Sequence, residues 1–88
     1  MPRNLLNSSA PHIAKHVDVA VNNILSVTFK ARGMTEEKAA ELVAKHGATA
    51  LAFTKGRVDV YLKDGTEPDE AYDKAFADLG TTAATGYR

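Results

Sequence analysis

The chain contains no cysteine and no tryptophan among its 88 residues. The absence of cysteine excludes disulfide bonds, zinc–thiolate sites and a thiol nucleophile. Its six glycines are isolated from one another, so the chain has no glycine-rich loop of the dinucleotide-binding or P-loop type. These absences remove several large classes of enzyme before any helix or strand is considered.

Long apolar runs and an excess of one charge are missing as well. The first seven residues lack the apolar centre of a signal peptide, and no run approaches the roughly 20 residues that span a bilayer. The chain has 11 basic and 11 acidic residues and a formal net charge of zero, so bulk electrostatics favours neither nucleic acid nor an anionic membrane. We therefore expect a cytoplasmic protein without a membrane segment, or a component of a virion.

The composition is that of an ordinary globular chain. Hydrophobic residues make up 44% of the sequence and charged residues 25%. Eighty-eight residues suffice for one domain with a single modest core. The distribution of apolar residues predicts an N-terminal arm over 1–9, one domain over 10–80 and a C-terminal tail over 81–88.

Residues 48–63 have the pattern of a β-hairpin. Two stretches of alternating residues flank Lys55 and Gly56, and a two-residue turn ending in glycine is a strong hairpin signal. The expected cross-strand pairs on the apolar face are Phe53 with Val58, Leu51 with Val60, and Thr49 with Leu62. This pattern predicts a sheet with one face exposed to water.

A second strand is predicted over 24–31, where Leu25, Val27 and Phe29 alternate with polar residues. Residues 10–22 are compatible with two structures. The β-branched residues favour a strand, whereas a helix would place Ile13, Val17, Val21 and Ile24 on one face.

Two helices are clearly delimited. The first is predicted over 35–46, with Thr35 as its N-cap, acidic residues in its first turn and Gly47 as its C-terminal cap. Its apolar stripe consists of Ala39, Leu42, Val43 and His46. The second is predicted over 67–79, with Thr66 as its cap, Pro68 in its first turn and Gly80 at its end. Its apolar stripe consists of Ala71, Tyr72, Ala75, Phe76 and Leu79.

Together these elements predict an α+β fold, a two-layer sandwich in which two helices cover one face of a mostly antiparallel four-stranded sheet. The order is ββαββα if residues 10–22 form a strand. If they form a helix, the order is βαββα, with an N-terminal helix and an optional closing strand, as in a ferredoxin-like arrangement.

Candidate catalytic and metal-binding residues are few. His12 and His16 are four residues apart, a spacing that would place both on one face of a helix, but no third ligand is suitably spaced. The acidic residues Asp64, Glu67, Asp69, Glu70, Asp73 and Asp78 lack the alternation of a calcium loop. We therefore expect no enzyme activity, no cofactor and no metal, and keep a small enzyme or metal protein built on these groups as the last alternative.

The exposed face of the predicted sheet is the preferred contact surface, because tyrosine and arginine are the residues that anchor protein interfaces. The residues proposed for contact are Arg57, Asp59, Tyr61 and Lys63, with Leu5, Leu6 and Tyr87 in the two tails as secondary contacts. The corresponding function is a small non-enzymatic module that binds a protein or a second copy of itself. It would act as a subunit of a larger assembly, such as a phage structural protein or an inhibitor of host defence.

The second functional hypothesis is a nucleic-acid-binding accessory protein. It requires Lys15, Lys30, Arg32 and Arg57 to converge into one basic patch, because phosphate binding depends on clustered positive charge.

Overall fold

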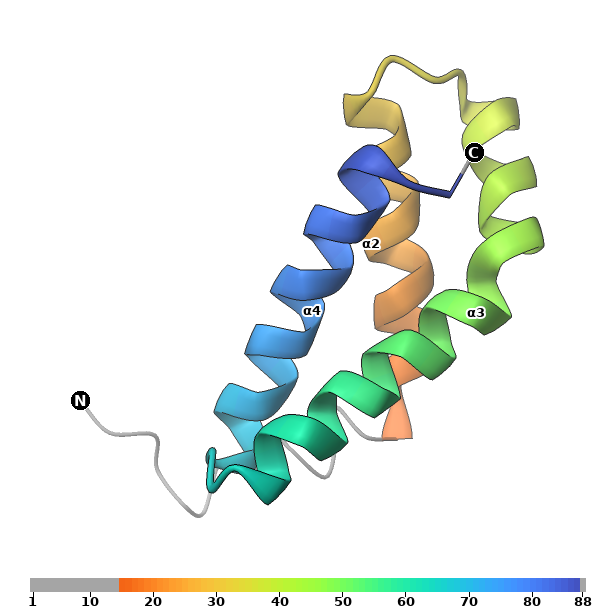
Figure 1. Cartoon of the computed structure of the whole chain (residues 1–88). Helices are drawn as coiled ribbons and strands as arrows, with labels where there is room; N and C mark the ends of the chain where they lie inside the picture. Colours follow the sequence, from red (N-terminus) through yellow and green to blue (C-terminus); the bar gives the residue numbers. More distant parts are fainter. Residues whose placement is uncertain (1–14, 88) are drawn as a thin grey trace.

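The structure is a computed structural model that describes residues 15–87, and in them the chain forms three α-helices and no strand (Figure 1). The helices are α2 (Val17–Ala31), α3 (Glu36–Lys63) and α4 (Pro68–Thr85). The predicted α+β sandwich is therefore wrong, and the fold is a small all-α bundle. Neither sheet order, ββαββα or the ferredoxin-like alternative, is formed.

Helix α2 includes the segment predicted as the strand 24–31. Its buried residues are Val17, Val21, Leu25 and Phe29, which recur every four residues and so follow one side of a helix. Val27, which alternates with Leu25 and Phe29 in the strand pattern, is 67% exposed. Of the two structures weighed for residues 10–22, the part from Val17 onward is helical, and residues 10–14 lie outside the described part.

Helix α3 includes both the predicted first helix and the whole predicted hairpin. The helix does not end at Gly47 but continues through Lys55 and Gly56 to Lys63. Its second half buries Ala50, Thr54 and Val58, again four residues apart. Thr54 satisfies its hydroxyl group locally, because Oγ1 donates a hydrogen bond to the Ala50 carbonyl oxygen at 2.8 Å. The hairpin prediction placed Ala50 and Thr54 on the water-exposed face of a sheet, and that prediction is wrong.

The N-terminal halves of the helix predictions are confirmed. The Thr35 side chain caps α3 by accepting a hydrogen bond from the Lys38 backbone N–H at 3.1 Å. Pro68 occupies the first turn of α4, where its missing N–H removes no helical hydrogen bond. Thr66 is not the cap, because the N-cap position is Glu67, and Gly80 does not end α4, which continues to Thr85.

Both interhelical loops contain a glycine in the left-handed conformation. Gly33 has φ +93° and Gly65 has φ +89°, a region that residues with a side chain rarely adopt. Each glycine lies just after the end of a helix, where the backbone N–H of the following residue donates a hydrogen bond to a carbonyl oxygen five residues earlier. These bonds run from the Met34 N–H to the Phe29 carbonyl and from the Thr66 N–H to the Tyr61 carbonyl. This is the Schellman arrangement, and it allows the chain to reverse direction within a few residues.

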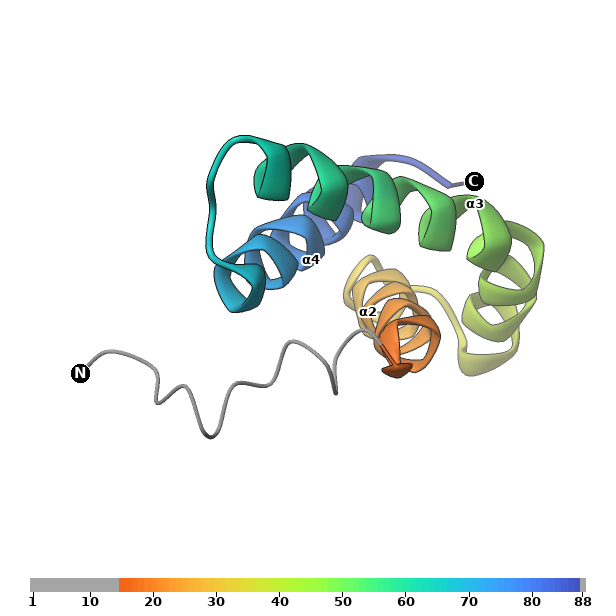
Figure 2. The same ribbon diagram turned by 90° about the horizontal axis from the view of Figure 1, so that it is seen from below.

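The three helices contact one another pairwise, so the core lies along the axis of the bundle (Figure 2). The larger cluster joins all three helices through buried residues such as Leu25, Phe29, Leu42 and Leu79. A smaller cluster of Val58, Ala71 and Ala75 joins the second half of α3 to α4. Much of the α3–α4 contact is made by alanines, which allow two helices to approach closely but bury little area per residue.

Substitution of Gly56 distinguishes the helix from the hairpin by the sign of its effect. Gly56 is exposed within α3, and a Cβ added there would meet nothing within 4 Å. We expect G56A to increase the free energy of unfolding by about 0.5–1 kcal/mol, because alanine is the better helix former. Chemical denaturation followed by circular dichroism measures this. The matched variant G33A should destabilise, and destabilisation by G56A would contradict the helix.

Candidate protein-binding surface

A shallow hollow lies between α2 and α3, on the outer side of the bundle. Its volume is about 310 Å³, and it is framed by Asp18, Asn22, Val43, Ala44, Gly47, Ala48 and Leu51. The α2 side contributes the two polar residues, and the α3 side contributes five apolar or small ones. The hollow therefore has one polar and one apolar wall, and such a mixture of apolar and polar groups is typical of protein interfaces.

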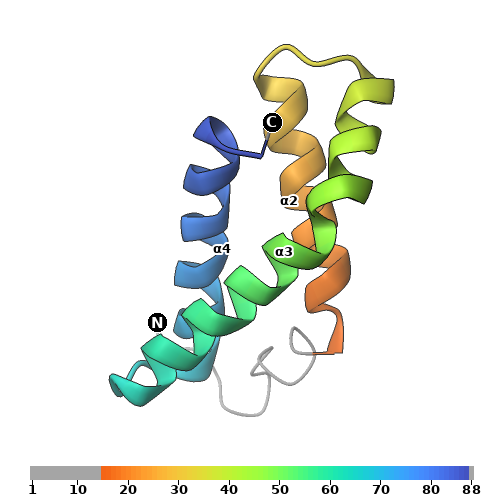
Figure 3. The same cartoon turned by 45° about the vertical axis from the view of Figure 1, so that its right-hand side comes forward.

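Gly47 explains why the hollow exists at this place. A Cβ at Gly47 would lie 3.3 Å from Asn22 Oδ1, which is tight, so glycine lets the Asn22 side chain lie close against α3. The ribbon of α3 also bends in its middle, in the region that contains this glycine (Figure 3). Because Ala44 and Ala48 reach no further than a methyl group, the surface on either side of Gly47 stays low.

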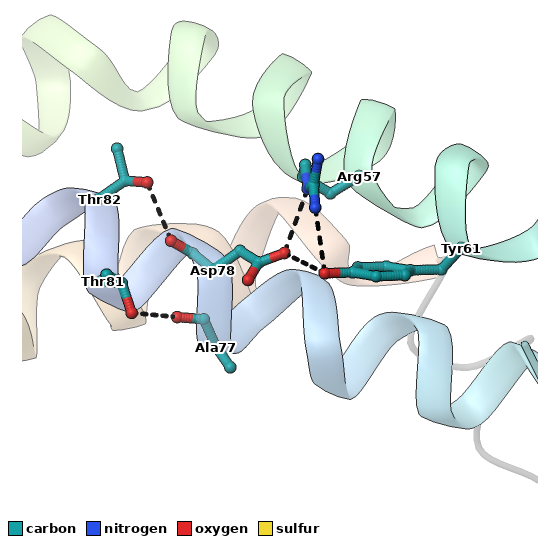
Figure 4. A network of polar contacts seen from close by, with 6 residues as sticks. All are labelled: Arg57, Tyr61, Ala77, Asp78, Thr81 and Thr82. Atoms are coloured by element: carbon teal, nitrogen blue, oxygen red, sulfur yellow. Dashed lines mark hydrogen bonds and ion pairs between the residues drawn. The ribbon is translucent and has the colours of Figure 1, made fainter.

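A network of polar contacts joins the C-terminal half of α3 to α4 (Figure 4). The Tyr61 hydroxyl donates to Asp78 Oδ2 at 2.5 Å, and Arg57 Nε donates to the same oxygen at 3.1 Å. Arg57 also donates from Nη2 to the Tyr61 hydroxyl at 3.2 Å. The side chains of Lys74 and Arg57 both lie near the Tyr61 ring, with Lys74 Nζ 5.6 Å and Arg57 Cζ 5.1 Å from its centroid.

This network shifts the ionisation of its members. The hydrogen bond from Tyr61 has the largest effect and holds the pKa of Asp78 below its usual range. Desolvation opposes it, and the hydrogen bond and positive charge of Arg57 lower the pKa further. The hydrogen bonds to Tyr61 and Asp78 raise the pKa of Arg57. Asp78 is therefore ionised at neutral pH and acts as the acceptor that two donors from α3 share.

The four residues predicted to form one contact face do not lie on one face. Residues 57 and 61 are one helical turn apart, as are 59 and 63, but the two pairs point to different sides of α3. Arg57 and Tyr61 turn toward α4, whereas Asp59 and Lys63 are exposed. Tyr61 thus has a structural role, and a contact role for these residues stays a prediction without the sheet face that suggested it.

The two tail positions differ in what the structure says of them. Leu5 and Leu6 lie outside the described residues. The Tyr87 ring lies 5.1 Å from the His46 ring, centroid to centroid, and packs against the larger core cluster. Burial raises the pKa of the Tyr87 hydroxyl. Residues 81–85, predicted as part of a tail, belong to α4.

The basic residues of the nucleic-acid hypothesis do not converge. Lys15 precedes the start of α2 and Lys30 lies in its last turn, so nearly the whole length of the helix, about 20 Å, separates them. Arg32 Nη1 donates to the carbonyl oxygens of Ala83 and Gly86 at 2.9 and 2.8 Å. Arg57 is bound to Asp78. Three of the four cations are thus engaged within the protein, since Lys30 also pairs with Glu36 at 3.7 Å. The fourth, Lys15, lies before the start of α2, at the end of the helix opposite Lys30.

Within residues 15–87, no group of three histidine, cysteine, aspartate or glutamate side chains is arranged to hold a metal ion. His12 lies outside the described part, so the predicted His12–His16 pair is not tested. None of the described helices combines the length and apolar character needed to cross a bilayer.

Comparison with protein-family models, curated proteins and solved structures finds no match for this chain. The case for a function therefore comes from the geometry of the surface alone. The hollow was not predicted from the sequence, because its two walls are more than 20 residues apart along the chain. The one local signal is the pair of alanines on either side of Gly47, at positions 44 and 48.

Proposed function

We propose that this protein is a small non-enzymatic module that binds another protein chain through the hollow between α2 and α3, as a subunit or accessory component of an assembly. The observation that carries the proposal is the hollow itself, about 310 Å³ in volume and lined mostly by apolar or small residues. Protein interfaces concentrate their binding energy in such pockets, which accept an apolar side chain and exclude water.

The margin of the hollow supports recognition of a protein rather than a small molecule. The hollow is shallow and lies on a surface that continues over the exposed residues Ala40, Ala44, Ala48 and Ala52 of α3. A deep, enclosed cavity with converging polar groups would be typical of a small-molecule site. A cytoplasmic location, or a place in a virion, is part of the proposal as a narrower form of the same role.

The proposal is tested by site-specific photo-crosslinking in the cells that make the protein. A photo-reactive residue at Ala44, at the mouth of the hollow, should give a crosslinked protein product, and the added substitution A48W should abolish it by filling the hollow. The matched control is the same photo-reactive residue at Ala77, which is exposed on α4. Equal crosslinking at both positions, a product that A48W leaves unchanged, or no product at Ala44 would each overturn the proposal.

A further inference from the structure

One side of α4 carries two neighbouring aromatic rings that are only partly buried. Tyr72 and Phe76 are half-buried, and their ring centroids are 6.2 Å apart. Lys74 and Asp78, which contact Tyr61 of α3, each follow one of these rings by two residues, and two residues correspond to about 200° around a helix. The two rings therefore lie on the side of α4 that is opposite to its contact with Tyr61.

Helix α2 does not complete the packing around the first half of α4. The two helices are joined at their C-terminal ends, where Arg32 contacts Ala83, and they diverge toward their N-terminal ends (Figure 1 and Figure 3). Among the described residues, the smaller core cluster of Val58, Ala71 and Ala75 has members from α3 and α4 alone. The first half of α4 thus has an apolar side that is left to another part of the chain or to a partner.

We infer that this side of α4 binds the N-terminal segment of the same chain, residues 1–14, which thereby closes the diverging end of the bundle. The inference concerns a different surface from the hollow and goes beyond the proposed function. Two features of the chain select this occupant over another molecule: the place from which the segment leaves α2, and the match between its composition and that of the surface.

The segment leaves α2 beside the first turn of α4. Counting back 15 residues from Arg32 leads to Val17 at the start of α2, and the same count from Ala83 leads to Pro68 at the start of α4. Leu6 precedes Lys15 by nine residues, a stretch that extends to about 30 Å. The half of α4 that carries the rings is only about 12 Å long, so the segment is long enough to cover it.

The composition of the segment matches that of the surface. Residues 1–14 include Arg3, Leu5 and Leu6 and no acidic residue. On α4, Asp69 and Asp73 lie one helical turn apart on the side of the two rings, and Asp69 is only 6% exposed although it is a charged residue. The two leucines therefore cover the rings while Arg3 faces the carboxylates, a pairing that strengthens hydrogen bonds across the contact.

The test is paramagnetic relaxation enhancement in the full chain, which has no cysteine of its own and so takes a nitroxide at one introduced position. With the nitroxide on Asn7→Cys, the amide signals of 69–76 should lose most of their intensity, and those of 36–41 should keep theirs. R3E should return at least about half of the lost intensity, because it sets like charges together. Adding D73K to R3E should restore part of the loss, since it reverses one of the facing charges.

The matched control is D59K, which makes the same change of charge as D73K at an exposed position on α3. In a chain that keeps Arg3 it should leave the loss over 69–76 unchanged, whereas D73K should reduce that loss. Equal effects of D59K and D73K would show that net charge alone controls the contact, and the inference would then be wrong.

Other outcomes would overturn the inference in ways that identify the true contact. Full intensity over 69–76 would show that the segment does not bind α4, and a loss over 43–48 instead would place it in the hollow. A loss seen in copies without nitroxide, mixed with copies that carry it, would show that the segment binds a second chain. The crosslinking at Ala44 tests the proposed function separately, so either result stands without the other.

Discussion

F29A is expected to lower the free energy of unfolding by about 3–5 kcal/mol, the loss typical of a phenylalanine deleted from a packed core. Phe29 is fully buried in α2, and the guanidinium of Arg32 lies 5.8 Å from its ring centroid. A domain of this size has a total stability of the order of 5 kcal/mol. We therefore expect F29A to be largely unfolded at 37 °C, as measured by urea denaturation followed by circular dichroism.

The matched control for F29A is V27A, two residues earlier in the same helix. Val27 is 67% exposed, so its truncation should change the free energy of unfolding by no more than about 0.5 kcal/mol. In a β-strand the two side chains would lie on the same face, and both substitutions would be costly. Similar losses for F29A and V27A would show that residues 24–31 form a strand and that the helical bundle is wrong.

The failure of the strand prediction has a specific cause at these residues. Leu25, Val27 and Phe29 satisfy an alternation of two, while Val17, Val21, Leu25 and Phe29 satisfy a spacing of four, and a β-branched sequence offers both patterns at once. The structure uses the spacing of four, and Val27 is left on the surface. The spacing of four continues from Val17 to Phe29, across the boundary between the predicted segments 10–22 and 24–31, and this continuity favours a helix.

The hairpin prediction failed for a related reason. The residues that α3 buries in its second half are Ala50, Thr54 and Val58, and two of these three are small or polar. A pattern based on large apolar residues therefore assigned the core to Leu51 and Val60, of which Val60 is 51% exposed. Close packing of alanines on α3 and α4 is a tertiary effect that overrides the local preference of Lys55-Gly56 for a turn.

The features that the sequence does predict are local. Thr35 and Pro68 identify the beginnings of α3 and α4 because their effect depends only on neighbouring backbone groups. The buried stripes of 39–42 and 71–79 follow from the helical period. By contrast, the hollow beside Gly47 and the contacts of Arg57 and Arg32 join helices distant in the sequence, so no local pattern contains them.

The contact of Arg32 with the end of α4 carries the second large expected effect. Helix α4 has no basic residue in its last turn, so nothing within the helix balances the partial negative charge of its C-terminal carbonyls. Arg32, at the C-cap position of α2, supplies this charge from outside. It also occupies two of the carbonyl oxygens that the helix end leaves without an internal partner, those of Ala83 and Gly86.

R32A should therefore lower the free energy of unfolding by about 1.5–3 kcal/mol, the range for hydrogen bonds that involve a charged group. It should also speed amide hydrogen exchange over the last turn of α4 and loosen Tyr87 from His46, which nuclear magnetic resonance detects through the two ring environments.

R32K should recover part of the loss, because lysine keeps the charge without the planar guanidinium. K30A removes an exposed neighbour that forms a surface ion pair with Glu36 at 3.7 Å, and it should cost no more than about 0.5 kcal/mol. If R32A matched K30A in stability and left exchange in the last turn unchanged, Arg32 would not hold the end of α4.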